Sequence, residues 1–322
     1  MKRVFVTRKL PGKALKRLQD DGLQVDVWPD FLAPPRKKLL ERARGASALI
    51  TMLEDNVDAE LMDAAGPQLK IIAQYAVGLD NIDLSAAKER GIVVTHTPGV
   101  LTDATADLAF ALLAAAARRV VEGHDYVRRG EWQTWHPELL LGPELHGATV
   151  GVIGFGRIGQ AFARRARGFD MKVLYSSRRP KPEAETGLSA EHTNLDELLE
   201  RSDFVSLHTP LTPETLRLMN AERLARMKEG AILINTARGK VVDTGALLTA
   251  LESGHLFAAG LDVTDPEPLP HDHPLATHPR VVLTPHIGSA GRSTRERMAA
   301  MVTGDVLAVL KGGLPLHPAP AS

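Results

Sequence analysis

Four side chains suited to acid–base and anion chemistry follow three apolar runs in the last third of the chain. Arg238 follows the run at 231–234, Asp262 and Glu267 follow the run at 258–261, and His286 follows the run at 281–283. In open α/β sheets, ligands bind at the crevice outside the carboxyl ends of the strands. If the three runs are neighbouring strands, a guanidinium, two carboxylates and an imidazole converge on one crevice.

This set of groups is suited to hydride transfer at a 2-oxo or 2-hydroxy acid. Arg238 can hold a substrate carboxylate with paired hydrogen bonds, and His286 can give a proton to the carbonyl oxygen near neutral pH. A carboxylate at Glu267 would favour the imidazolium and orient it, and we expect Asp262 to hold the nicotinamide amide. Taken singly, Arg238 could be a surface charge and His286 a residue that makes a loop hydrogen bond. Glu267 could be an ordinary acid of a proline-rich loop, and Asp262 could cap a turn. The order of the four residues at successive strand ends favours the catalytic interpretation.

A glycine motif between residues 148 and 164 predicts a dinucleotide site. An apolar run at 148–153 leads into Gly154, Gly156 and Gly159, and a helical pattern follows. In this context the first glycine allows a tight turn, the second lets a pyrophosphate approach the backbone, and the third lets helix and strand pack closely. The N–H groups at the helix start then face the phosphates. The alternative is a glycine-rich turn with no ligand.

The end of the next predicted strand indicates which nicotinamide cofactor is used. NAD-binding domains of this type carry an acid there that binds the ribose 2′-hydroxyl, whereas this strand ends in Ser176, Ser177, Arg178 and Arg179. An arginine attracts a 2′-phosphate. We therefore expect NADP(H) to be preferred; the alternative is that both arginines are solvated loop charges and NAD is accepted too.

The elements that must position these groups alternate between strand and helix patterns. This alternation predicts an α/β fold with two doubly wound domains built on parallel sheets, the second a Rossmann-type array of six strands. A long apolar helix is expected from residue 103 to about 122, followed by a loop with Trp132 and Trp135 that packs on a partner subunit or on the same chain. A helical pattern at 293–310 is expected to return to the first domain.

The composition excludes several classes of site. Lys+Arg and Asp+Glu both number 39, so no net charge favours nucleic acid or anionic membrane. The absence of cysteine excludes disulfides and cysteine metal sites, and we expect no metal. The charged N-terminus and the lack of a long apolar run lead us to expect a cytoplasmic, soluble protein.

Seven motifs spread over the chain make it resemble the D-isomer-specific 2-hydroxyacid dehydrogenase family, in its glyoxylate reductase/hydroxypyruvate reductase branch. They are VGLDN at 77–81, TPGVLTD at 97–103, the glycine motif, NTARG at 235–239, GLDV at 260–263, PEPLP at 266–270 and TPHIGSA at 284–290. The resemblance implies a flavodoxin-like substrate domain, residues 1–99 and 290–322, into which the Rossmann domain, residues 100–289, is inserted. It also implies a homodimer joined through the long helix and the loop with the two tryptophans.

The resemblance also implies roles for individual residues. The catalytic set is Arg238, Glu267 and His286. The substrate-binding set is Leu53, the backbone of Val77 and Gly78, Arg238 and Ser289. The cofactor-binding set is Thr105, Gly154, Phe155, Gly156, Arg157, Ile158, Gly159, Ser176, Ser177, Arg178, Arg179, His208, Thr209, Pro210, Thr236, Ala237, Arg238, Asp262, His286 and Gly288.

The same resemblance keeps some alternatives open. Some members of the branch carry a tryptophan where Leu140 stands here, so glyoxylate, hydroxypyruvate and bulkier 2-oxo acids are not ranked. A short phosphoglycerate dehydrogenase is another enzyme of the family. A nucleotide-sensing scaffold that resembles the C-terminal binding protein corepressors would retain the same three catalytic residues. Formate dehydrogenases fit poorly, because they carry Gln at the position of Glu267.

Overall fold

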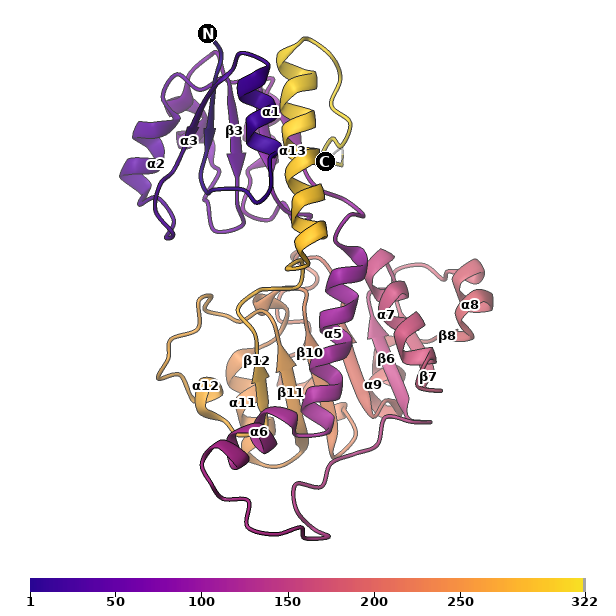
Figure 1. Cartoon of the computed structure of the whole chain (residues 1–322). Helices are drawn as coiled ribbons and strands as arrows, with labels where there is room; N and C mark the ends of the chain where they lie inside the picture. Colours follow the sequence, from indigo (N-terminus) through magenta and orange to yellow (C-terminus); the bar gives the residue numbers. More distant parts are fainter. Residues whose placement is uncertain (321–322) are drawn as a thin grey trace. The chain divides into compact units, whose positions relative to one another are not determined.

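The chain divides into two compact units, each built on a parallel β-sheet. The computed structural model describes residues 1–320. The first unit comprises Met1–Leu101 and the segment that begins at Ser289, and the second comprises Thr102–Gly288 (Figure 1). Every strand pair in both sheets is parallel, which confirms the predicted α/β class.

The first unit holds a five-stranded sheet in the order β2-β1-β3-β4-β5, which is the flavodoxin-like order. Its strands are β1 (Arg3–Val6), β2 (Gln24–Val27), β3 (Ala48–Thr51), β4 (Ile71–Gln74) and β5 (Val93–Thr95). Its helices are α1 (Ala14–Asp20), α2 (Arg36–Ala43), α3 (Ala59–Ala65), α4 (Leu84–Glu89) and α13 (Arg292–Leu310). All residues of β3 and β4 are buried, as expected for parallel strands that helices cover on both faces.

The returning C-terminal helix α13 is part of the core of the first unit. Its buried residues Ala299, Val302 and Val306 pack in one cluster with Val4 and Ile50 of the sheet. Leu18 of α1 belongs to the same cluster, so this part of the core forms only when α13 has packed beside the N-terminal residues.

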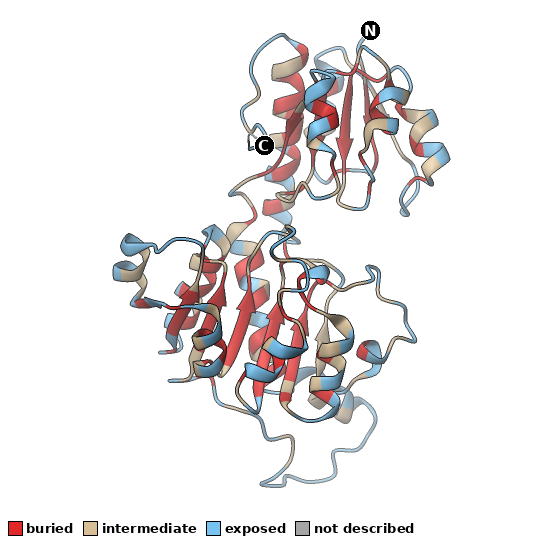
Figure 2. Ribbon diagram, turned by 180° about the vertical axis from the view of Figure 1, so that it is seen from behind, coloured by how far each residue is buried: buried red, intermediate tan, exposed pale blue. Residues whose placement is uncertain are grey.

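The second unit holds a seven-stranded sheet in the order β12-β11-β10-β9-β6-β7-β8 (Figure 2, buried strands in red). Its strands are β6 (Thr149–Ile153), β7 (Lys172–Ser176), β8 (Ala190–His192), β9 (Phe204–Leu207), β10 (Ala231–Asn235), β11 (Leu256–Leu261) and β12 (Val281–Leu283). The order from β8 to β11 is that of a Rossmann sheet, with β12 added at the far edge. The expected count of six strands was wrong, because β8 is a three-residue edge strand with two exposed residues and no apolar run.

The helices of the second unit cover both faces of its sheet. They are α5 (Thr102–Ala117), α6 (Val120–Arg128), α7 (Arg157–Arg167), α8 (Pro182–Leu188), α9 (Leu195–Arg201), α10 (Ala221–Arg226), α11 (Thr244–Glu252) and α12 (Pro274–Thr277), with the short 3₁₀ turn η1 (Gly239–Val241). Asn and Asp side chains accept a backbone N–H at the start of helices in both units, as N-caps do; these caps are Asp58, Asp83, Asn194, Asn220 and Asp243.

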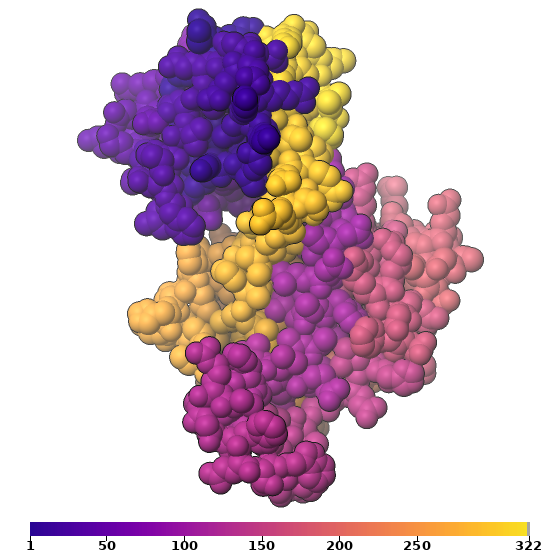
Figure 3. All heavy atoms as spheres, viewed as in Figure 1, coloured from indigo at the N-terminus to yellow at the C-terminus, as the bar shows by residue number. Residues whose placement is uncertain are grey.

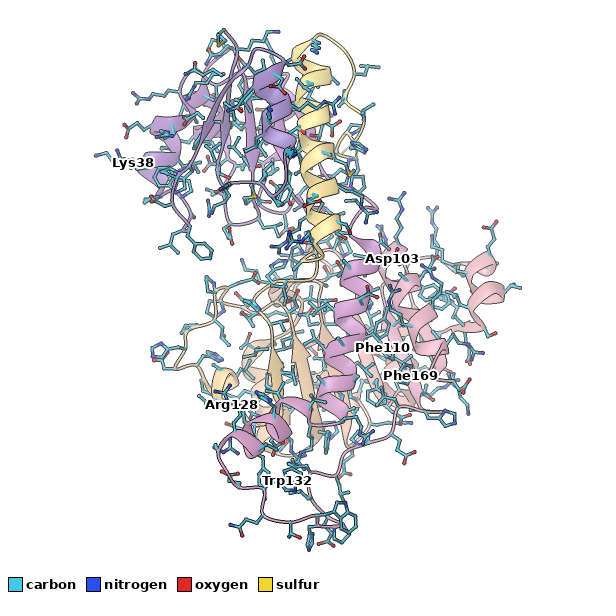
Figure 4. All side chains as sticks on the ribbon, viewed as in Figure 1. Lys38, Asp103, Phe110, Arg128, Trp132 and Phe169 are labelled. Carbon is cyan, nitrogen blue, oxygen red and sulfur yellow. The ribbon has the colours of Figure 1, made fainter. Side chains whose placement is uncertain are left out.

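The single long helix expected from residue 103 to about 122 is two helices in the structure. Helix α5 ends at Ala117, and Arg119 has a left-handed backbone with φ 50°. The Arg119 guanidinium bonds both carboxylate oxygens of Glu122, at 2.6 and 2.8 Å, and so closes the turn that starts α6. Within the second unit, Phe110 of α5 lies against Phe169, with ring centroids 4.8 Å apart (Figure 4).

After α6 the chain runs through residues 129–147, here called the arm, without helix or strand. Figure 3 shows the arm in magenta on the surface of the second unit. Trp132 (Figure 4) and Trp135 remain 62% and 78% exposed, and Val120, Val121 and Val127 of α6 are exposed as well. No helix among residues 1–320 is long and apolar enough to cross a membrane.

The packing of β6 predicts that Gly151 tolerates no side chain. A Cβ built there would lie 2.3 Å from Leu198 Cδ2 and 2.5 Å from Ser202 Oγ. Overpacking of this kind typically costs about 1–3 kcal/mol, so Gly151→Ala should lower the thermal midpoint. The control is Gly187→Ala in α8, where a Cβ meets nothing within 4 Å and should be neutral or stabilising. Equal midpoints for the two variants in thermal denaturation would contradict this packing argument.

Candidate active site

The glycine turn between β6 and α7 has the form that a pyrophosphate requires. Gly154 has φ 92°, and a Cβ there would lie 2.7 Å from the His208 carbonyl. A Cβ at Gly159 would lie 2.2 Å from the Gly154 oxygen, so the third glycine permits helix and strand to touch. A Cβ at Gly156 meets nothing within 4 Å. The backbone at Gly156 is therefore exposed at the start of α7, where helix N–H groups lack intrahelical partners.

Two neighbouring strand ends present buried hydroxyls that no protein group satisfies. Thr209 follows β9 and Thr236 follows β10, and neither Oγ1 has a hydrogen-bond partner among the described residues. A buried polar atom without a partner is unfavourable, so these hydroxyls fit contact with a bound polar molecule. Together with the open glycine turn, they fit a dinucleotide that lies along these strand ends.

Phe155, directly after the first glycine of the motif, is buried, unlike Arg157 and Ile158. Its side chain is 1% exposed and stacks on Tyr175, with ring centroids 4.0 Å apart. Only its backbone is therefore in a position to meet a ligand. Arg157 is exposed and Ile158 is half-buried.

The loop after β7 presents two exposed arginines on a fixed backbone. Ser177 Oγ donates a hydrogen bond of 2.7 Å to the carbonyl oxygen of Arg179. The Tyr175 hydroxyl accepts the Lys181 N–H at 2.7 Å and donates to the Glu185 carboxylate. Arg178 and Arg179 lie between these contacts, and both are exposed. Sequence reasoning missed this bracing role of Tyr175, which the sequence presents only as an apolar strand residue.

His208 contributes no positive charge to this edge of the sheet. Its Nε2 lies 2.9 Å from Ser206 Oγ, and its ring packs on Phe162 at 5.1 Å. Burial lowers the pKa of His208 to about 3, so the imidazole is neutral at physiological pH. Pro210 is exposed two residues further on.

Arg238 lies in a turn that Asn235 and Gly239 shape. Asn235 is buried, its Oδ1 accepts the Ala237 N–H at 3.0 Å, and its Nδ2 donates to the Arg238 carbonyl at 2.9 Å. A Cβ at Gly239 would lie 1.9 Å from the Thr264 carbonyl oxygen, so only glycine fits. The half-buried Arg238 side chain donates to the Ala237 carbonyl at 2.8 Å. The motif at 235–239 thus fixes the start of the arginine side chain.

Glu267 and His286 form a direct pair. The His286 Nδ1 lies 2.5 Å from Glu267 Oε1; the His286 side chain is 30% exposed and the Glu267 side chain 39%. The other carboxylate oxygen, Oε2, accepts the Thr264 N–H at 3.3 Å. No protein group within residues 1–320 hydrogen-bonds His286 Nε2. The carboxylate therefore orients the ring so that Nε2 is left for another molecule.

The turn that carries His286 is anchored by the buried carboxylate of Asp262. Oδ1 accepts from the Thr284 hydroxyl at 2.6 Å and from Ile287 N–H at 2.8 Å, and Oδ2 accepts from Gly288 N–H at 2.7 Å. Desolvation raises the pKa of Asp262, although these hydrogen bonds partly counteract it. Asp262 thus organises the turn at 284–288 rather than the turn that follows it in sequence.

At Gly288, helix α5 comes close to the loop after β11. A Cβ there would lie 3.2 Å from Asp262 Oδ2 and 3.3 Å from Thr105 Cγ2 of α5. The absence of a side chain at Gly288 therefore places Thr105 beside the Asp262 carboxylate.

The remaining predicted residues belong to the first unit. Leu53 follows β3, Val77 and Gly78 follow β4, and Ser289 precedes α13; all are half-buried. The Leu53 loop is held by Asp55, whose carboxylate accepts from the Thr7 hydroxyl at 2.5 Å and from Met52 N–H at 2.7 Å. Burial raises the pKa of Asp55.

Asn81 is a second residue of this region whose role sequence reasoning missed. Its Nδ2 donates to the carbonyls of Met52 and Asp55 at 2.9 and 2.8 Å, and its Oδ1 accepts from Gln74 at 2.8 Å. Asn81 therefore ties the loop after β3 to the loop after β4. The available signal was its place in the motif at 77–81.

Comparison with known proteins agrees with this architecture. Residues 110–288 match the family described as D-isomer specific 2-hydroxyacid dehydrogenase, NAD binding domain. A glyoxylate reductase from Thermococcus litoralis is 53% identical over 317 residues, which cover 97% of this chain and 95% of the relative.

Two solved structures extend this similarity to the fold. A protein from Thermus thermophilus is 61% identical with a TM-score of 0.94, over 98% of this chain and 99% of that one. An NADPH-dependent glyoxylate/hydroxypyruvate reductase from Sinorhizobium meliloti, in complex with NADP and malonate, is 34% identical with a TM-score of 0.85, over 99% and 97% of the two chains. The family resemblance seen in the motifs is thereby confirmed: the chain belongs to the D-isomer-specific 2-hydroxyacid dehydrogenase family, in its glyoxylate reductase branch, and is an NAD(P)-dependent enzyme.

Proposed function

We propose that the protein reduces glyoxylate, and hydroxypyruvate as a related small 2-oxo acid, to the 2-hydroxy acid with NADPH, and that His286 is the general acid. The observation that carries this proposal is the 2.5 Å contact between His286 Nδ1 and Glu267, which leaves Nε2 without a protein partner among the described residues. An imidazole oriented in this way is suited to give one proton to a carbonyl oxygen. The glyoxylate reductase from Thermococcus litoralis supports the choice of substrate.

The proposed reaction divides its tasks among this chain's residues. When bound, the nicotinamide supplies a hydride to the substrate carbonyl carbon. His286 Nε2–H gives its proton to the carbonyl oxygen, so the alcohol forms and the neutral imidazole is reprotonated from solvent. Arg238 binds the substrate carboxylate and the carbonyl oxygen, and the N–H groups of Val77 and Gly78 receive the carboxylate. Leu53 and Ser289 are proposed to line the substrate pocket.

The cofactor is proposed to lie along the strand ends described above. The glycine turn and the start of α7 receive the pyrophosphate, and Thr209 and Thr236 offer their unpartnered hydroxyls. The Asp262 carboxylate accepts three hydrogen bonds from its own chain and can accept one more. We propose that this fourth donor is the nicotinamide amide, and that Thr105 also contacts that amide. The 2′-phosphate is proposed to lie at Ser176, Ser177, Arg178 and Arg179, a strand end that itself carries no acid.

We also propose that the protein is a homodimer that buries the arm and the exposed side of α6. Trp132 and Trp135 of the arm and the three exposed valines of α6 are large apolar side chains that the described part of the chain leaves uncovered. Large exposed apolar surfaces mark association sites. A second copy of the chain is the partner that the family resemblance implies.

The general-acid role predicts a severe loss of turnover in His286→Ala. Because general acid catalysis supplies about 10²–10⁴-fold, kcat with glyoxylate and NADPH should fall by that factor while the Kd for NADPH changes little. The matched control is His271→Ala, which removes an exposed imidazole from the loop before α12. The decrease in NADPH absorbance measures kcat, and protein fluorescence measures NADPH binding. Near-normal turnover in His286→Ala would remove His286 from this role, and a wild type inactive on glyoxylate and hydroxypyruvate would refute the proposed function.

The Glu267–His286 contact predicts a loss of turnover when the carboxylate is replaced by an amide. The carboxylate lies 2.5 Å from His286 Nδ1 and orients the ring, whereas the amide of Glu267→Gln can present its own N–H there and lose that orientation. We expect kcat with glyoxylate to fall in Glu267→Gln while the Kd for NADPH changes little. The decrease in NADPH absorbance measures kcat. Glu252→Gln, a change of the same kind at the exposed end of α11, should leave kcat where it is; an unchanged kcat in Glu267→Gln would count against the pair.

The loop after β7 predicts that kcat/KM is higher with NADPH than with NADH. The double variant Arg178→Ala with Arg179→Ala should lose about 1–3 kcal/mol of NADPH binding if charged hydrogen bonds are removed, and little NADH binding. Lys16→Ala with Arg17→Ala removes two exposed positive charges from α1 and serves as the control. Kinetics with both nucleotides decide the question. Equal efficiency with NADPH and NADH in wild type and variant would show that the loop does not select the cofactor.

A further inference from the structure

The loop after β4 is held through its carbonyl groups by the residues that follow β5. The Ala76 carbonyl accepts the Thr97 N–H at 2.9 Å. The next carbonyl, that of Val77, lies 2.9 Å from His96 Nδ1. A carbonyl oxygen can only accept, so Nδ1 of His96 carries a proton and donates. Two consecutive carbonyl groups of one loop are thus both held by residues 96 and 97.

This clamp sets the direction of two backbone N–H groups. In a planar trans peptide, the C=O of one residue and the N–H of the next point in opposite directions. Holding the Ala76 carbonyl therefore directs the Val77 N–H away from residues 96 and 97, and holding the Val77 carbonyl does the same for the Gly78 N–H. Among the described residues, neither N–H has a protein acceptor. Both donors are thus directed away from residues 96 and 97 and are left for a ligand, and a carboxylate can accept from two such neighbouring N–H groups.

His96 is itself rigidly held within the first unit. It is 9% exposed, and its backbone N–H donates to the His317 carbonyl at 3.1 Å. His317 in turn is fixed by the fully buried carboxylate of Asp305 in α13, which accepts from its backbone N–H at 3.2 Å and lies 3.0 Å from its Nδ1. The C-terminal segment continues this support, because the Ala319 N–H donates to the Val94 carbonyl of β5 at 2.8 Å.

We propose that His96 is a positioning residue for the substrate carboxylate. Its Nδ1–H holds the Val77–Gly78 peptide in the orientation that presents the Gly78 N–H to the carboxylate, and it does so without touching the substrate. This inference rests on the proposed function, in which Val77 and Gly78 receive the carboxylate. Without the imidazole the Val77–Gly78 peptide is free to rotate, and the paired donors are lost for much of the time.

The test compares two side chains of nearly the same shape at position 96. His96→Asn keeps an N–H donor close to the place of Nδ1, and His96→Leu has none. We expect His96→Leu to raise the KM for glyoxylate and the inhibition constant of oxamate, a carboxylate-bearing analogue, at least tenfold. The KM for NADPH should stay within twofold, and His96→Asn should recover most of the loss.

The control is His255→Leu in the second unit, which removes a similar bond. There the imidazole Nε2 lies 3.1 Å from the Leu224 carbonyl, and we expect the glyoxylate KM to stay unchanged. A merely structural role for His96 would lower the thermal midpoint and impair glyoxylate and NADPH alike. If His96→Leu does not fold, His96→Gln is used instead. The longer Gln side chain brings its amide N–H near the position of His96 Nε2, which is too far from the Val77 carbonyl for a hydrogen bond.

Two results overturn this inference while leaving the proposed function intact. One is a glyoxylate KM within twofold of the wild type in folded His96→Leu, or in His96→Gln where that variant takes its place. The other is a His96→Asn variant as impaired as the variant without a donor at Nδ1. A wild type that turns over no 2-oxo acid refutes the proposed function instead, so the two failures are distinguishable.

Discussion

The turn that carries His286 depends on the hydrogen bonds of one buried carboxylate, that of Asp262. It accepts three hydrogen bonds from the segment 284–288 and so determines where that segment turns. His286 has φ 51° in this turn, and its N–H donates to the Asp262 carbonyl. A left-handed backbone at a residue other than glycine persists only when the surroundings enforce it. Asp262 thus helps to hold the backbone from which His286 reaches Glu267.

The same principle recurs at the other strand ends. Asn235 shapes the turn of Arg238, Tyr175 and Ser177 brace the loop of Arg178 and Arg179, and the side chains of Asp55 and Asn81 join two loops of the first unit. In each case a polar side chain satisfies loop backbone groups that no strand or helix can pair. The residues that meet ligands then project from a backbone whose conformation is already determined.

Charge is distributed sparingly along this edge. His208 is neutral because burial lowers its pKa to about 3, and the glycine turn presents backbone N–H groups at the start of α7. Arg178 and Arg179 add two exposed positive charges in the loop after β7. In the proposed function, the backbone of the glycine turn binds the pyrophosphate common to both nucleotides, and these two arginines bind the 2′-phosphate that distinguishes NADPH from NADH.

The class of fold, the glycine turn and the family could all be predicted from the sequence, because alternating apolar runs and glycines at fixed spacing report directly on backbone geometry. The sequence did not reveal β8, whose three residues carry no periodic signal, or the end of α5, which depends on the Arg119 backbone and its bond to Glu122. The burial of Phe155, the hydrogen bonds of Asp262 and Asn235, and the contact of His96 with the Val77 carbonyl became evident only in the folded chain. Each depends on hydrogen bonds or packing that the folded backbone creates, most of them between segments far apart in the chain, and no local pattern of residues encodes such contacts.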